Sequence, residues 1–207
     1  MRFLEMLLLV AALGALSVPA AAGDVVPSAD VKGDLAKLES YRTLAEKQDE
    51  RIPLMRQLAA SGGSDVCARF ITLLTDEFEH IREEAQELLV ELKWPGTDEL
   101  LLKQGVGSKE AEICRRCIEV LGRRKCEAAV TALMSILKGQ RENVVRVAAA
   151  RALERIGSEK ARRALIDGLS ARGAAGGASA AALGRLGVRE AGSKIERLLA
   201  DKDGLCT

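Results

Sequence analysis

A phrase of seven residues returns about every thirty residues along this chain. The clearest copy runs from Arg151 to Gly157, near copies occupy 116–122 and 181–187, and a fainter one occupies 87–93. The copies end at positions 93, 122, 157 and 187, which lie 29, 35 and 30 residues apart. Self-similarity at such a period is typical of chains that stack one supersecondary unit on the next. The repeat therefore predicts a stack of units rather than one globular core.

Apolar residues recur at helical spacing inside each repeat, so every unit is predicted to be a pair of helices. The four predicted pairs are 65–74 with 79–93, 98–103 with 109–121, 126–137 with 144–156, and 159–169 with 178–186. Residues 23–63 are expected to hold a leader and N-terminal capping helices, of which Pro53 opens the second. A last helix is expected over 190–200. The glycine after each second helix is expected to form a left-handed C-cap.

The run from Asn143 to Gly157 has an apolar-Arg start, an Ala-rich middle, and then Leu, two variable residues and Ile-Gly. It resembles the second helix of a HEAT repeat, and more closely the short HEAT-like repeats of phycocyanobilin lyases. The resemblance implies an all-α, right-handed α-solenoid of about four HEAT-like helix pairs over 64–200, with N- and C-terminal capping helices. It also implies second helices that line a concave face. It further implies that Arg82 and Arg146 hydrogen-bond a neighbouring turn between repeats.

Both ends of the chain lie outside this repeat region. Residues 1–22 contain a charged start, an apolar run over 3–18 and small residues before position 23, which together predict a cleaved signal peptide. The alternative is an uncleaved anchor, although the run is short for a span of about 20 residues. We therefore expect an exported protein, periplasmic or extracellular, with no membrane insertion after cleavage. Residues 201–207 are expected to be a C-terminal tail.

The net charge of +1 hides an asymmetry: residues 65–99 carry a net charge of −7, and residues 103–207 carry +9. Such a distribution can present two differently charged halves to partners, or it can reflect solvated faces alone. Aromatic residues make up 2% of the chain, too few for a platform on which single-stranded nucleic acid stacks. The basic half would fit DNA, but export argues against it, so no nucleic-acid partner is expected.

Three cysteines align with alanines of the following repeat: Cys114 with Ala149, Cys117 with Ala152, and Cys126 with Ala161. The first two of them form a C-x-x-C pair. Since free cysteine behaves as a small apolar residue, we expect these three to fill the core. A disulfide from Cys126 to either neighbour is the alternative. Three thiols without a nearby histidine fall short of a four-ligand metal site, so no metal is expected.

Catalytic residues are not expected anywhere in the chain. His80 is the only histidine, and the repeated His-Glu pairs of HEAT-like hydroxylases that bind two irons are missing. The glycines at 173, 176 and 177 match no phosphate-binding motif, so they are interpreted as a flexible inter-helix loop with a close helix contact. The chain is therefore predicted to be a non-enzymatic protein without a cofactor.

The candidate partner-binding residues are charged and recur at matching repeat positions. Glu87, Arg116 and Arg151 share one position, and a second position lies four residues further on. The full set is Glu83, Glu87, Glu91, Arg116, Arg151, Arg155 and Arg185. A basic spot at 123–125 is expected on the rim of the same face.

These residues predict an exported scaffold or adaptor that binds an unidentified protein partner through its concave face. One alternative is a lyase-like subunit that handles a chromophore or cofactor. The other is a structural component of an envelope assembly that self-associates end to end through Ile195, Leu198 and Leu199.

Overall fold

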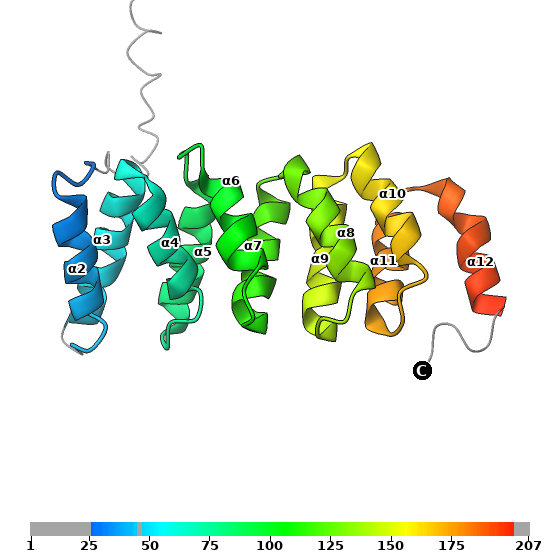
Figure 1. Cartoon of the computed structure of the whole chain (residues 1–207), viewed down its shortest axis with the longest axis horizontal. Coiled ribbons are helices and arrows are strands. Elements are labelled where there is room, and N and C mark those ends of the chain that lie inside the picture. The colour runs from blue at the N-terminus through cyan, green and yellow to red at the C-terminus, as the bar shows by residue number, and fades with distance from the viewer. Residues whose placement is uncertain (1–25, 45–46, 201–207) are drawn as a thin grey trace, which may run out of the picture.

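The structure, a computed structural model, describes residues 26–44 and 47–200, and this part of the chain is helical without a strand. Figure 1 shows the helices side by side in one elongated row. The predicted signal peptide, the predicted tail with Cys206, and the side chains of Leu198 and Leu199 lie outside the described residues. The fold is thus all-helical and solenoid-like, as the repeat predicted.

Alternate helices form two layers, and most helices contact the next-but-one helix along the chain. The first layer consists of α2 (Val31–Ser40), α4 (Ser64–Leu73), α6 (Thr97–Leu100) continued by the π-helix η2 (Leu101–Val106), α8 (Val130–Lys138) and α10 (Glu159–Gly168). The second layer consists of α3 (Gln48–Ser61), α5 (Glu79–Glu91), α7 (Ala111–Arg123), α9 (Asn143–Ile156) and α11 (Ala174–Arg185). Short 3-10 turns η3 (Glu127–Ala129) and η4 (Arg189–Ala191) precede α8 and the last helix, α12 (Gly192–Ala200).

The core repeats with the sequence. One position of the second helices is occupied by Leu89, Ile118, Leu153 and Leu183, all fully buried. The position four residues earlier holds a small, fully buried side chain in each helix: Ala85, Cys114, Ala149 and Ser179. Small residues at this position let the neighbouring helices approach closely, and the larger residue then fills the space between layers. The sequence pattern therefore predicted the core correctly.

Several helix boundaries predicted from the sequence are wrong for a shared reason. A proline or glycine that normally ends a helix is tolerated inside one, because packing or solvent compensates for its cost. Pro53 does not open α3 but lies inside it, five residues after Gln48. The backbone carbonyl that its missing N–H would have engaged belongs to exposed Asp49, so water can satisfy it. The first helix of the second unit continues past its predicted end as η2, in which Gly105 packs so closely on Cys117 that a Cβ would lie 2.3 Å from its Sγ.

The glycine C-cap prediction is confirmed at Gly157 and Gly187, whose φ angles are +67° and +65°, but it is wrong at Gly122. Gly122 lies inside α7, where an added Cβ would come within 2.7 Å of the Cα of Ala152 on α9. The interpretation of glycines 173, 176 and 177 as a loop holds for Gly173, which precedes α11 with a φ of +69°, but is wrong for Gly176 and Gly177, because α11 begins at residue 174. Here too a glycine permits a close contact, since a Cβ on Gly176 would lie 2.4 Å from a backbone oxygen.

Candidate protein-binding face

The predicted partner-binding residues all lie on helices of the second layer. Glu83, Glu87 and Glu91 are on α5, Arg116 is on α7, Arg151 and Arg155 are on α9, and Arg185 is on α11. All are exposed except Arg116, which is half-buried. Because α5, α7, α9 and α11 contact one another in that order, these side chains occupy a continuous surface, here named the second-helix face.

Two of the predicted residues are already engaged by the neighbouring unit. Both carboxylate oxygens of Glu87 accept hydrogen bonds from Arg123, each 2.6 Å long. Arg185 donates in the same bidentate way to Glu154, at 2.5 and 2.7 Å. These hydrogen bonds hold the pKa of Glu87 and that of Glu154 below their usual range. Glu87 and Arg185 therefore connect repeats before they can serve a partner.

The charged residues of α7 form an internal network. Glu112 accepts from Arg115 and from Arg116, each at 2.6 Å, and Arg115 also bonds Glu119 at 2.6 Å. The hydrogen bonds from Arg115 lower the pKa of Glu112, and those from Arg116 add to this effect. Partial burial acts in the opposite direction, and the resulting pKa is about 2. Arg116 also donates to Gln86 of α5, at 3.1 Å. The middle of the second-helix face is consequently close to neutral.

Four predicted residues remain without such partners. Within residues 26–44 and 47–200, Glu83, Glu91, Arg151 and Arg155 make no side-chain hydrogen bond or ion pair. The two carboxylates lie on α5 and the two guanidinium groups lie on α9, one helix on either side of neutral α7. Packed helices are about 9 Å apart, so about 18 Å separates the two charged rows.

A groove of about 560 Å³ opens beside the acidic row. It is lined from three helices: by Ile52 of α3, by His80, Glu83 and Glu87 of α5, and by Arg116 of α7. The His80 ring lies against Phe78, with 5.7 Å between ring centroids. The volume of the groove falls within the range of ligand pockets. Ligand pockets are mostly apolar, however, whereas the lining of this groove is mainly charged. A polar or cationic side chain of a protein partner fits it better than an apolar cofactor.

Arginines fasten the turns behind this face. Arg82 donates to the carbonyl oxygens of Asp76 and Glu77, at 2.7 and 3.0 Å, and Arg146 donates to that of Leu137 at 3.1 Å. The expectation that these arginines hydrogen-bond backbone near a turn is confirmed, but the expectation that they link repeats is wrong, because each bonds the turn or helix end just before its own helix, inside one unit. Long cationic side chains near a helix end satisfy carbonyl groups that the helix leaves free.

Two of the three cations in the basic spot expected at 123–125 are engaged in hydrogen bonds within the protein. Arg123 holds Glu87, and Arg124 donates 2.9–3.1 Å hydrogen bonds to three carbonyl oxygens at the end of α5 and a 2.5 Å bond to Asp98. Because α5 ends without a glycine cap, Arg124 takes over the capping of its last carbonyls. Sequence alone marks three adjacent cations and does not distinguish the one that turns inward.

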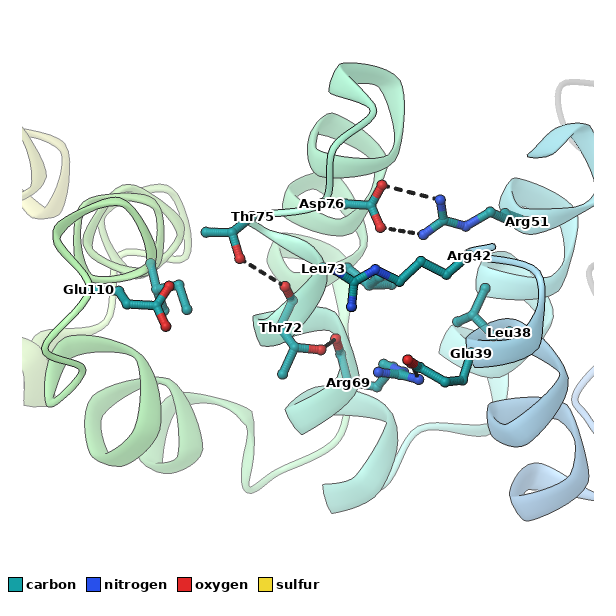
Figure 2. A pocket seen from close by; sticks show the side chains of 11 residues that line it. Leu38, Glu39, Arg42, Arg51, Arg69, Thr72, Leu73, Thr75, Asp76 and Glu110 are labelled. Atoms are coloured by element: carbon teal, nitrogen blue, oxygen red, sulfur yellow. Dashed lines mark hydrogen bonds and ion pairs between the residues drawn. The ribbon is translucent and has the colours of Figure 1, made fainter. Parts of the chain in front are cut away.

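A buried ion pair anchors α3 to the turn between α4 and α5, and the sequence analysis missed it. Figure 2 shows the guanidinium group of Arg51 facing the carboxylate of Asp76, beside a cavity of about 320 Å³. Arg51 is fully buried and Asp76 is 4% exposed. Burial alone would raise the pKa of Asp76, but hydrogen bonds from Arg51 and from the Phe78 amide outweigh it, so this pKa is lowered.

A signal for this pair was present in the sequence. Arg51 stands three, four and seven residues before Leu54, Met55 and Leu58, so it lies on the apolar stripe of α3. A charged residue at such a position needs a buried partner.

Cys114, Cys117 and Cys126 occupy the core as predicted, and Cys67 is buried with them. Cys67, Cys114, Cys117 and Cys126 are buried and free of disulfides. Burial raises the pKa of Cys67 to about 11, and it raises the pKa of Cys117 further. These four thiols therefore remain protonated at neutral pH, which suits core packing rather than thiol chemistry.

The described residues contain neither a metal-binding cluster nor a membrane-spanning helix. They hold no group of three or more His, Cys, Asp or Glu residues placed to bind a metal ion. No helix among them combines the length and apolar character needed to cross a bilayer.

Comparison with known proteins identifies the repeat. No curated protein matches the chain. Residues 99–175, from the end of α6 to the start of α11, match the family model for HEAT repeats. The same buried positions recur in α5 and in α11 on either side of that range, which agrees with a HEAT-repeat protein.

Proposed function

We propose that this chain is an exported, non-enzymatic adaptor that binds a protein partner through its second-helix face. HEAT repeats suit a scaffold for protein interactions. The proposal is supported by four exposed charges that make no side-chain hydrogen bond or ion pair in the described structure: Glu83 and Glu91 on one side of α7, and Arg151 and Arg155 on the other.

The arrangement of these charges gives the face a direction. A partner with cationic groups near α5 and anionic groups near α9 would bind in one orientation, because the reverse orientation brings like charges together. Charge pairs at the rim of an interface chiefly raise the association rate and set the orientation, while buried contacts supply most of the affinity. The groove beside His80 offers space for one inserted side chain.

We also infer the type of repeat and the compartment of the protein. The spacing of 29–35 residues between copies supports short HEAT-like repeats of the phycocyanobilin-lyase type, in a right-handed stack of about four units whose second-helix face is concave. Residues 1–22 support export to the periplasm or beyond. Export is tested by fusing these residues to a reporter enzyme that is active only after disulfide formation outside the cytoplasm.

Affinity capture with the variant Arg151→Glu, Arg155→Glu tests the adaptor function. These two residues are preferable to Arg116 and Arg185, whose reversal would also break contacts within the chain. The matched control reverses two exposed cations of the first layer, Lys160→Glu and Arg162→Glu on α10, with the same change of net charge.

A protein captured by the parent and by the control, but lost with the α9 variant, would support the proposal and locate the binding face. Equal capture by all three proteins would move the interaction elsewhere. Failure of the parent to retain any specific protein from envelope and secreted fractions would contradict the adaptor function.

A further inference from the structure

We propose that a second copy of this chain docks on the second-helix face, related to the first by a twofold axis that passes near α7. In this arrangement α5 of each copy lies against α9 of the other. The proposal does not depend on the adaptor function, because it concerns the purified protein alone.

Charged side chains are ordered by sign across the second-helix face. The outward side of α5 is acidic, with Glu83, Glu87 and Glu91, whereas the outward side of α9 carries Arg151 and Arg155. Between them α7 pairs its own acidic and basic side chains. The face therefore runs from negative through neutral to positive.

Such an order is self-complementary under twofold symmetry. A rotation of 180° about an axis that runs parallel to α7, between the α7 helices of the two copies, places the acidic row of one copy on the basic row of the other, and it does so twice in one interface. The two α7 helices face each other across the axis, and their charged residues do not repel strongly because they are already paired within each chain. A twofold contact is also closed, so it yields a dimer rather than a filament.

The outer helices of the face are compatible in shape. The same rotation brings α11 of one copy onto α3 of the other. Apart from Arg185 at its end, which pairs with Glu154 of its own chain, the outward side of α11 carries small residues, Ala174, Gly177, Ala181 and Gly184, and a Cβ added to either glycine would meet nothing within 4 Å. This flat surface leaves room for the more prominent outward side of α3, which carries Pro53 and Arg56.

The area available matches that of a stable contact. Five helices, each about 18 Å long and about 9 Å from the next, present roughly 800 Å². A standard-size protein interface buries about 800 Å² on each partner. The face is short of large apolar side chains; Val144, 59% exposed at the start of α9, is the main one. The dimer should therefore depend strongly on charge and weaken with salt.

The test measures mass by analytical ultracentrifugation over a range of protein and salt concentrations. Variant A carries Glu83→Lys and Glu91→Lys, so both of its rows are positive; variant B carries Arg151→Glu and Arg155→Glu, so both of its rows are negative. Neither pair of residues makes a side-chain hydrogen bond or ion pair within the described part of the chain, although Arg151 and Arg155 interact electrostatically with Glu154, and Glu91 does so with Arg123. Circular dichroism checks that each variant is folded. The Lys160→Glu, Arg162→Glu protein is the control.

We expect the parent and the control to dimerise at low salt, with at least about a tenfold weaker association in 0.5 M NaCl. Variants A and B should each be monomeric, and an equimolar mixture of A and B should form a heterodimer, because both contacts are then between opposite charges. A monomeric parent, a parent dimer that both variants retain, or an A and B mixture that stays monomeric would overturn the proposal. Growth of the parent into species larger than a dimer would also overturn it, since that indicates a head-to-tail contact.

Discussion

Replacing Arg51 with alanine removes one half of the buried ion pair and leaves the carboxylate of Asp76 without its guanidinium partner. Arg51 is fully buried and donates to Asp76 and, at 2.9 Å, to Gln48, so its loss breaks the contact between α3 and the α4–α5 turn. Breaking one partner of a buried pair typically costs about 3–5 kcal/mol, because the remaining charge cannot be hydrated. In a chain of this size such a loss corresponds to a fall in melting temperature of about 10 °C.

The same helix provides a matched control. Arg56 of α3 also pairs with a carboxylate across units, Glu84, but 54% of the Arg56 side chain is exposed. Exposed pairs contribute about 0–1 kcal/mol, so Arg56→Ala should lower stability little. Urea unfolding followed by circular dichroism gives both free energies of unfolding. A loss for Arg51→Ala no greater than the loss for Arg56→Ala would refute the reasoning.

A double variant separates charge from packing. Arg51→Met with Asp76→Leu removes both charges and keeps apolar volume at each site, so it should recover most of the stability that Arg51→Ala loses. If the double variant is as unstable as the single one, the effect arises from lost packing and not from an unpaired charge.

Three further predictions follow from packing, burial and titration. Gly122→Ala should lower the free energy of unfolding by about 1–3 kcal/mol, because the added Cβ would press on the backbone of α9. Gly184→Ala should raise it by about 0.5–1 kcal/mol, because Gly184 faces open space on α11 and alanine favours a helix. Urea unfolding measures both changes. In a Cys206→Ser background, a thiol reagent at pH 7 should label the four buried cysteines only after denaturant is added, and rapid labelling of the native protein would contradict their burial. The pKa of Asp76 is lower in the folded than in the unfolded chain, so ionised Asp76 stabilises the folded protein. This stabilisation is complete well above the ordinary carboxyl pKa of about 4 and is lost as the pH falls through the folded pKa. When the free energy of unfolding is measured at decreasing pH, it should fall less in the Arg51→Met, Asp76→Leu protein than in the parent.

Periodicity was sufficient to predict the helices and the core, because both depend on residues close together in the chain. The second helices α5, α7 and α9 lie within two residues of their predicted bounds, and the aligned cysteines and alanines share buried positions as expected. Periodicity failed where a local preference competed with a contact from another unit. Gly122 has the sequence mark of a helix end, yet its contact with Ala152, 30 residues away, keeps it inside α7.

The candidate site was less predictable, because pairing between charges is decided across units. Arg123 and Glu87 are 36 residues apart in the chain, and Arg185 and Glu154 are 31 apart. A sequence shows that such residues share a face, but not which of them neutralise each other. The pKa of Glu87 is lowered by its bond to Arg123, whereas the structure gives Glu83 on the same helix no comparable partner within the described residues.

This division assigns two roles to one row of charges. Pairs separated by about one repeat hold consecutive units together, so reversing Glu87 or Arg185 disturbs the stack as well as its surface. The unpaired residues of α5 and α9 can be reversed at a smaller cost, because no side-chain hydrogen bond or ion pair within the described structure is lost. An effect on binding or on self-association that appears only with the unpaired set would therefore arise at the surface. An effect that appears only with the paired set would arise from a change in how the units pack.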